Sequence, residues 1–421
     1  MTDTSIQPSD VLETDDGVSL KVKLARATRR NKLRALALVA PLGIFLIIGF
    51  LWPIGAMLLR SVHAPDFGEI MHRTAIVIQA WDGEGIPDET VFAALVEDLQ
   101  QAKEEKTIGR AATRFNFSMP GTRSVFTRTG RKVNTLEEGP YTEAMIEINE
   151  AWGQHEFWLN FQRLVKPFTA RFYLNSIDYQ IGSENEIMRQ PDERQIYVKL
   201  FIRTLIMSAI ITVLCILLGY PISYLLATLP LRYSNLLMIL VLLPFWTSLL
   251  VRTTSWITLL QKEGVLNDIV VGLGLISDEN RLQMMFNATG TVIAMVHILL
   301  PFLVLPLFSV MKTIPPSYMR AARSMGATQF TAFRRVYIPQ TLPGVGAGSI
   351  LVFILSIGFY ITPALVGGQS GQLISNIIAY HMQRSLNWGL AAALATILLI
   401  GVLFLYWLYN RIVGVDNMKF G

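Results

Sequence analysis

Six long apolar segments constrain what this chain can fold into more than any other feature. Each has about the length that a helix needs to cross a bilayer, roughly 20 residues. The sequence is 52% hydrophobic with a mean hydropathy of +0.42, which is high for a water-soluble protein and favours a membrane protein. We expect membrane spans near residues 33–59, 200–226, 236–260, 288–311, 346–365 and 390–412.

Basic residues are distributed unevenly around these spans. Seven of them lie in Lys21–Arg34, directly before the first span. Basic residues collect in cytoplasmic loops, and with six spans both chain ends lie on the same side. The sequence therefore predicts cytoplasmic termini and a cytoplasmic segment 313–344. The other basic residues that support this orientation are Arg232, Arg320, Arg323, Arg334, Arg335, Arg411 and Lys419.

Residues 61–195 differ from the rest because they are mixed in charge and contain no run of spanning length. About 135 residues are enough for a small folded domain. Helical spacing of apolar residues predicts helices at 87–106 and 141–164, and β-rich stretches predict strands at 74–79 and 171–179. Since only one span precedes this insert, we expect it outside the cytoplasm.

The fold class that follows is an all-α polytopic membrane protein with six transmembrane helices and a small extracytoplasmic α/β domain. Its predicted parts are a cytoplasmic tail at 1–32, a first transmembrane helix at 33–60, the insert at 61–195 and a core at 196–421. The tail is polar and acidic at its start, without an apolar period, which is typical of a segment that lacks fixed structure.

The segment 313–344 has an unusual spacing of Ala, Gly and Pro. Pro315 and Pro316 cannot continue the preceding helix, because proline lacks the N–H group that a helix needs. We predict a helix at 318–325 with Ser317 as its N-cap and Gly326 just after its end. A second helix is predicted at 328–337, before Pro339 and Pro343 break the chain again. The plainer alternative is an ordinary basic cytoplasmic loop.

The sequence AARSMGA followed by YIPQTLPGV resembles the coupling loop of permease subunits in binding-protein-dependent ABC importers. The alanines, the glycine and the distal Pro and Pro-Gly match, while Arg320 occupies the place of an acidic residue. The resemblance implies that this coupling segment, residues 313–344, docks on an ATPase. The implied contact residues are Tyr318, Arg320, Ala321, Ala322, Gly326, Ala327, Phe330 and Phe333.

Other stretches of the core are similar to the spermidine/putrescine permease branch of these importers, namely GYPISYLLA, LPFWTSLLVRT, VGGQSGQLISNIIAY and NWGLAAALA. The resemblance covers the first span and everything after residue 199, and it leaves the insert out. It implies a hetero- or homodimeric permease pair, two ATPase subunits and a periplasmic binding protein. Substrate would cross by alternating access in a bacterial inner membrane.

The sequence carries little that could do chemistry. It has no phosphate-binding glycine loop, so we expect ATP and Mg²⁺ on the partner ATPase, and no cofactor, metal or nucleic acid on this chain. The span centres contain no Asp or Glu, which argues against proton-coupled transport. A substrate path is predicted along Trp246, Arg252, Trp256 and Tyr360, against the alternatives of interfacial anchoring and packing.

Three functions remain open from the sequence. The first is import of a small organic cation, a polyamine such as putrescine or spermidine. The second is the same machine with an opine, an amino-phosphonate or an amino-acid derivative as substrate. The third is a membrane-anchored sensor or enzyme that acts through residues 61–195, although no catalytic constellation is visible there. On either of the first two, the chain is a transport subunit and not an enzyme.

Overall fold

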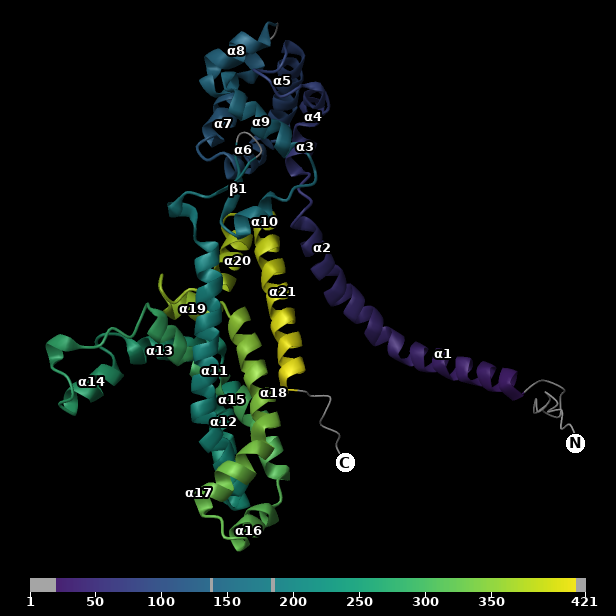
Figure 1. Ribbon diagram of the computed structural model, residues 1–421. Helices are drawn as coiled ribbons and strands as arrows, with labels where there is room; N and C mark the ends of the chain where they lie inside the picture. The colour runs from purple at the N-terminus through teal and green to yellow at the C-terminus, as the bar shows by residue number, and fades with distance from the viewer. Residues whose placement is uncertain (1–19, 137–138, 183–185, 414–421) are drawn as a thin grey trace, which may run out of the picture. The chain divides into compact units, whose positions relative to one another are not determined.

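The computed structural model describes residues 20–136, 139–182 and 186–413. The expectations for residues 1–19 and for Lys419 lie outside these ranges. The chain divides into two compact units, Met1–Leu59 and Arg60–Gly421. Regular structure in the described ranges is helical apart from one short hairpin (Figure 1).

The first unit is one long helical segment. It consists of α1 (Leu20–Leu46), a π-helical turn η1 (Ile47–Leu51) and α2 (Trp52–Arg60), whose last residue opens the second unit. Residues Ala25–Arg60 are long and apolar enough to cross a bilayer, and they include the first span predicted at 33–60.

The insert contains eight helices, four 3-10 turns and a hairpin among its described residues. They are α3 (Asp66–Ile70), α4 (His72–Val77), η2 (Ile78–Ala80), α5 (Glu89–Glu104), α6 (Ile108–Ser118), α7 (Arg123–Lys132), η3 (Val133–Thr135), α8 (Tyr141–Ile148), η4 (Glu150–Gly153), α9 (His155–Leu164), α10 (Arg171–Ser176), β1 (Tyr179–Ile181), β2 (Ile187–Arg189) and η5 (Asp192–Arg194). The strands pair antiparallel, with Gln180 opposite Met188.

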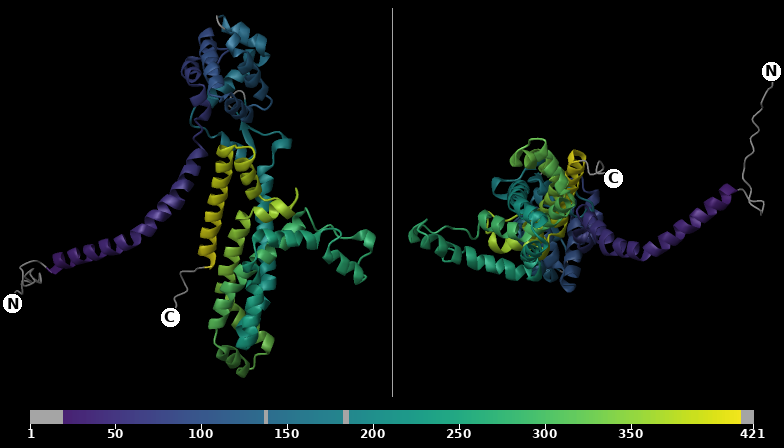
Figure 2. Two further views of the ribbon diagram at one scale, coloured as in Figure 1. Left: turned by 180° about the vertical axis from the view of Figure 1, so that it is seen from behind. Right: turned by 90° about the horizontal axis from the view of Figure 1, so that it is seen from below.

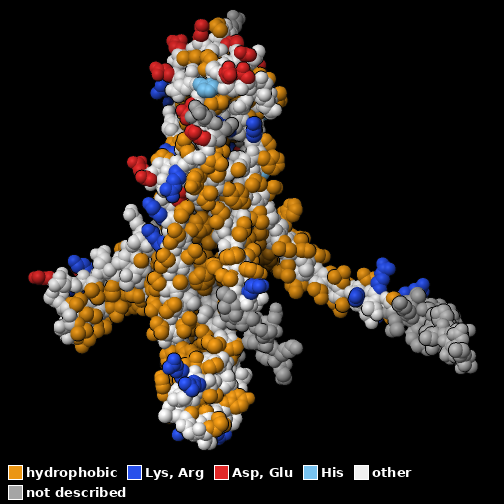
Figure 3. Space-filling view, in the orientation of Figure 1, with side chains coloured by type: hydrophobic (Ala, Val, Ile, Leu, Met, Phe, Trp, Pro, Cys, Tyr) orange, Lys and Arg blue, Asp and Glu red, His pale blue; other side chains and the backbone are white. Residues whose placement is uncertain are grey.

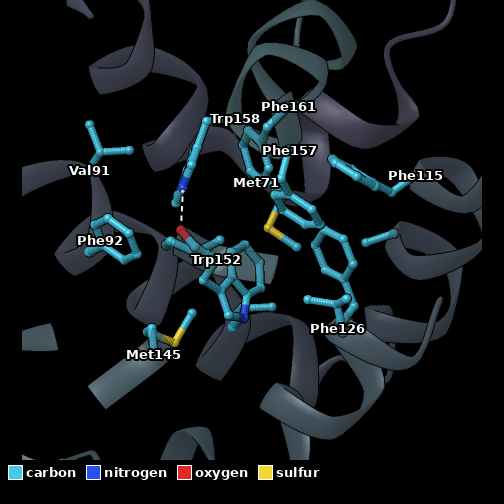
Figure 4. Packing of buried hydrophobic residues seen from close by; sticks show 14 of the residues in the cluster. Met71, Val91, Phe92, Phe115, Phe126, Met145, Trp152, Phe157, Trp158 and Phe161 are labelled. Carbon is cyan, nitrogen blue, oxygen red and sulfur yellow. Dashed lines mark hydrogen bonds between the residues drawn. The ribbon is translucent and has the colours of Figure 1, made fainter. Parts of the chain in front are cut away.

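Aromatic side chains fill the core of the insert (Figure 4). Phe115 stacks on Phe157 at a centroid distance of 4.4 Å, and both rings are fully buried. The two buried tryptophans satisfy their polar atoms: Trp152 Nε1 donates to Thr129 Oγ1 at 2.9 Å, and Trp158 Nε1 donates to the Trp152 carbonyl at 2.7 Å. A buried core whose polar atoms are hydrogen-bonded is what an independently folded domain needs.

The insert is mainly helical, and the two strands predicted in it are wrong; its β-structure is the hairpin β1–β2. Residues 74–79 form the end of α4 and the turn η2, and most of 171–179 forms α10. The buried carboxylate of Asp98 on α5 accepts hydrogen bonds from the N–H and the hydroxyl of Thr74, and so caps α4. This tertiary contact outweighs the local β-propensity. The helix predicted at 87–106 is confirmed as α5, whereas 141–164 is divided by η4 into α8 and α9.

The core at 196–421 is built around three long helices, α11 (Tyr197–Thr228), α15 (Ala288–Thr313) and α18 (Ile338–Gly358), which pack against one another (Figure 2). Gly219 and Gly348 lie in close contact with a neighbouring helix of this group. A Cβ atom at Gly219 would come within 2.6 Å of the Leu303 side chain, and one at Gly348 within 3.0 Å of it. Small residues at such crossings let helix backbones pack closely in a membrane.

The remaining core elements are shorter, except for the last helix. They are α12 (Leu231–Leu242), η6 (Leu243–Trp246), α13 (Leu249–Leu260), α14 (Val265–Gly272), η7 (Asp278–Asn280), α16 (Pro316–Ser324), α17 (Gln329–Ala332), the π-helical η8 (Phe333–Tyr337), α19 (Ile361–Val366), α20 (Ile374–Gln383) and α21 (Trp388–Val413). In the described part of the chain, five helices are long and apolar enough to cross a membrane, or six if a bent pair counts as one span.

The bent pair corresponds to the span predicted at 236–260. Helical segments Leu231–Trp246 and Leu249–Gly272 meet there at 100°. Pro244 lies just before the bend and cannot donate a backbone hydrogen bond. Its carbonyl accepts from the hydroxyl of Thr247 at 2.9 Å, and the Thr247 carbonyl accepts from Arg252 Nη2 at 2.9 Å. Side chains therefore satisfy the backbone that the break exposes.

The predicted break before the fifth span is wrong. Helical structure continues from Gln329 to Gly358 through Pro339 and Pro343. The π-helical turn η8 ends at Tyr337, two residues before Pro339, and its wider backbone relieves the clash that a proline ring meets in a regular α-helix. The fifth span therefore begins earlier than residue 346 and ends at Gly358, short of the predicted residue 365.

The insert contacts the core through α10 and through the segment that precedes α11. The Phe172 ring on α10 lies against the backbone of α21 at Gly389, where a Cβ atom would come within 2.3 Å of the ring. The Asp178 carboxylate accepts from the N–H groups of Tyr197 at 3.0 Å and Val198 at 2.9 Å, and so caps the start of α11. The insert thus ends directly on the first helix of the core bundle.

Candidate functional site

The candidate coupling segment forms a helical hairpin between α15 and α18. Helix α15 ends at Thr313 and α16 begins at Pro316, so the paired prolines stop one helix and start the next as predicted. Ser317 is not the N-cap, because Pro315 occupies that position and no side chain caps the helix. The first helical position tolerates proline, since its N–H would be unpaired anyway.

The end of α16 is a Schellman motif. Gly326 has φ of +88°, and its N–H donates to the Arg323 carbonyl at 3.0 Å. The next N–H, of Ala327, donates to the Ala322 carbonyl at 3.1 Å. No atom lies within 4 Å of the Cβ that another residue would add at Gly326. Glycine is therefore favoured here by its backbone conformation and not by lack of space, as the sequence predicted.

Large apolar side chains point outward from this hairpin. Met325 is 83% exposed, Phe330 is 72% exposed and Tyr318 is 50% exposed. The four arginines of the segment are exposed as well, and the segment contains no Asp or Glu. Basic and hydrophobic side chains accordingly lie together over α16 and α17 (Figure 3). An exposed apolar patch with a basic rim is typical of a surface that another protein covers.

The inner side of the hairpin is held by aromatic rings. Phe333 stacks on Tyr337 at 5.5 Å and meets Tyr224 of α11 edge to face at 5.4 Å. Tyr220, one turn earlier on α11, contributes a hydroxyl that hydrogen bonds Thr341 Oγ1 at 3.1 Å. A displacement of the coupling segment would therefore act directly on α11, the helix that carries the insert at its other end.

The predicted contact residues separate into two groups. Tyr318, Arg320, Ala321, Gly326 and Phe330 lie on the exposed side, while Ala322 is buried, and Phe333 and Ala327 are half-buried. Sequence analysis assigned no contact role to Met325, which the structure places on the exposed side. It also assigned no role to Tyr220 and Tyr224, although their i, i+4 spacing in GYPISYLLA puts both on one helix face.

The predicted substrate-path residues do not form one cluster. Trp256 Nε1 donates to His297 Nδ1 at 3.1 Å. Arg252 is engaged at the break by Thr247, and Trp246 is 74% exposed. Tyr360 lies at the unwound joint between α18 and α19, where its carbonyl accepts from Asn376 Nδ2 at 2.8 Å. Among the described residues, no hydrogen bond or ring contact joins the four.

Comparison with known proteins finds relatives for the core of the chain. Residues 217–413 match the family of binding-protein-dependent transport system inner membrane components, so the match leaves the insert outside it. The chain is 34% identical over 222 residues to the spermidine/putrescine transport system permease protein PotB of Escherichia coli strain K12, covering 52% of this chain and 80% of that protein. It is 31% identical over 229 residues to the inner membrane ABC transporter permease protein YdcU of the same organism, covering 51% and 71%.

A solved structure of a bacterial alginate ABC transporter, in complex with an alginate pentasaccharide-bound periplasmic protein, is 16% identical. It covers 53% of this chain and 80% of that chain with a TM-score of 0.43. The sequence relatives are permeases that carry out transport, and none of those named here is an enzyme. The chain therefore belongs to the binding-protein-dependent inner-membrane permeases of ABC transporters, in the branch of the spermidine/putrescine permeases.

Proposed function

We propose that this chain is the permease subunit of an importer for a small organic cation of the polyamine class. Its coupling segment docks on a partner ATPase, and the chain works with a second permease, two ATPase subunits and a periplasmic binding protein. Both termini and the coupling segment lie in the cytoplasm, and the insert lies outside. The relatives named above support the substrate class, and the basic flank before the first span supports the orientation.

The observation that carries this proposal is the exposed apolar face of the coupling segment. Tyr318, Met325 and Phe330 are exposed on either side of the helix end that Gly326 forms with its positive φ. Phe333 and Tyr337 connect the same hairpin to α11 through Tyr224. The coupling segment has four exposed arginines and no carboxylates. We therefore expect acidic residues around the docking site on the ATPase. Arg320, which replaces the family's acidic residue, then pairs with an acid on the ATPase.

A substitution at Gly326 tests the coupling role. Gly326→Val places a β-branched residue at φ +88°, which such residues adopt only with strain, so α16 should lose its end and the ATPase should no longer bind. Gly326→Asn is the matched control, because asparagine tolerates this conformation and open space surrounds the position. ATPase co-purification and uptake are measured for both. Full ATPase binding by the valine variant, with the chain present in the membrane, contradicts the proposal.

The substrate class needs a separate measurement. In such systems the binding protein selects the ligand, so a ligand screen of the partner binding protein distinguishes putrescine and spermidine from opines, amino-phosphonates and amino-acid derivatives. Saturable binding of a polyamine supports the proposal. Selective binding of a compound that bears a carboxylate or phosphonate would contradict the polyamine assignment and assign that compound's class as the substrate. The proposed coupling role would not be affected.

The insert is proposed to contact the binding protein. It has a buried core of its own and contacts α11 and α21. Binding of a partner to the insert can therefore affect the position of these transmembrane helices. Deleting residues 70–190 should reduce association with the binding protein and reduce uptake, while ATPase binding persists. Unchanged uptake and unchanged association after the deletion would show that the insert has another role.

A further inference from the structure

A cavity of about 1020 Å³ lies where the insert meets the core, lined by both apolar and charged side chains. Helices α6, α9 and α10 line it from the insert, and Tyr197, His381 and Leu390 line it from the core. Pockets that bind small molecules in proteins measure roughly 300–1,000 Å³, so this cavity is large enough to hold one. Neither the coupling role nor the predicted substrate path uses any of its residues.

The cavity has a surplus of positive charge. Five basic and three acidic side chains line it among the described residues, which gives a formal balance of +2; they are Arg114, Arg163, Lys166, Arg171, Arg194, Asp66, Glu156 and Glu193. Asp66 is already shared, since it pairs with Arg114 at 2.7 Å and with Arg110 at 3.8 Å. His381 adds no charge at neutral pH, because burial lowers its pKa to about 4.

Arg171 is partly buried, whereas Lys166 and Arg194 of the same lining are exposed. Its guanidinium is half-buried over the Phe172 ring at 5.3 Å, and it makes no ion pair within the described part of the chain. Burial and then the nearby charge of Arg114 lower the pKa of Arg171 to about 10. A partly desolvated cation beside a second cation is unfavourable unless an anion accompanies it.

We propose that this cavity binds a small oxyanion, a carboxylate or a phosphate group, between Arg171 and Arg114. A guanidinium presents two N–H groups in a plane that matches such an anion, and two guanidinium groups from different helices can grip one anion together. A polyamine, which is a cation, is disfavoured by the same lining, so the site is separate from the substrate route. The bound anion bridges α6 in the insert to α10, which packs on α21, and so tightens the joint between insert and core.

Thermal unfolding of the full chain, with the subunits that co-purify with it, tests the site. Inorganic phosphate and citrate are titrated against chloride at constant ionic strength. We expect a saturable rise of the unfolding temperature, and Arg171→Gln should weaken the apparent affinity about tenfold by removing charge-assisted hydrogen bonds. Arg128→Gln is the matched control, because this exposed arginine of the insert does not line the cavity. It should titrate like the unmodified protein.

Two arms of the experiment separate the sources of the oxyanion. Stabilisation by phosphate or citrate in detergent identifies a soluble anion. Stabilisation only in vesicles that contain phosphatidylglycerol, compared with vesicles of phosphatidylcholine alone, identifies a lipid headgroup. If no anion raises the unfolding temperature of the unmodified protein, the site does not exist, whatever the variants do. Equal loss of affinity in Arg128→Gln and Arg171→Gln would likewise overturn the proposal, because it would mark a general charge effect.

Discussion

The insert and the coupling segment differ in the burial of their large apolar side chains. In the insert, Phe115, Trp152 and Trp158 are fully buried, and the surface of its far end is rich in acidic side chains (Figure 3). In the coupling segment, Met325 and Phe330 are exposed and acidic residues are absent. About 135 residues can enclose a core of their own, whereas a hairpin of two short helices cannot. The comparison supports our proposals that the insert forms a domain of its own and that the coupling segment docks on a partner ATPase.

The largest expected effect is the loss of stability caused by a substitution in the core of the insert. Phe115→Ala removes a buried ring that contacts four other phenylalanine rings, and should lower the free energy of unfolding of the insert by about 3–5 kcal/mol. Phe168→Ala is the matched control, because this ring is 66% exposed, and it should change that free energy by less than about 0.5 kcal/mol. Denaturant unfolding followed by tryptophan fluorescence measures both. ATPase binding should survive in each variant; equal destabilisation would mean that the insert has no core of its own.

A smaller effect is expected on the exposed side of the coupling segment. Phe330→Ala should leave the unfolding temperature unchanged and weaken ATPase binding about 30-fold, the equivalent of about 2 kcal/mol for an aromatic anchor at an interface. Phe333→Ala removes a half-buried ring of the joint to α11 and should lower the unfolding temperature as well. The affinity of Phe330→Ala for the ATPase is measured by its binding to ATPase immobilised on a surface. If Phe330→Ala binds the ATPase normally, this face is not the docking surface.

The smallest effect concerns pH at the joint between insert and core. His381 hydrogen bonds Tyr197 and Ser385, and burial lowers its pKa to about 4 from an ordinary 6.5. Because the folded state binds the proton less readily than the unfolded state, the stability that neutral His381 contributes is present above pH 6.5 and is lost as the pH falls toward 4. We expect a contribution on the order of 1 kcal/mol after solvent screening.

His381→Gln should flatten this part of the pH profile, measured as unfolding temperature between pH 4 and pH 7.5. The coupling segment contains no Asp, Glu or His, so it contributes no titration of its own over the same range. An identical pH slope in the variant and the unmodified protein would assign the acid sensitivity to another group.

Local chemistry in the sequence was enough to determine the coupling hairpin and most of the spans. Pro316 and Gly326 bound α16 because one lacks a backbone donor and the other adopts positive φ without strain, and both requirements are local. Apolar length alone located α11, α15 and α21, since a bilayer requires it. The same reasoning explains why the helix α5 was predicted correctly from the spacing of its buried residues.

Only the tertiary structure decided the rest, because the deciding contacts join residues far apart in the sequence. Asp98 caps α4 and makes a helix of a segment that local propensity assigns to a strand. The π-helical turn before Pro339 lets the fifth span continue where a proline usually ends a helix. The outward position of Met325, and the meeting of Arg114 and Arg171 at one cavity, depend on how whole helices pack, which the order of residues along one helix does not reveal.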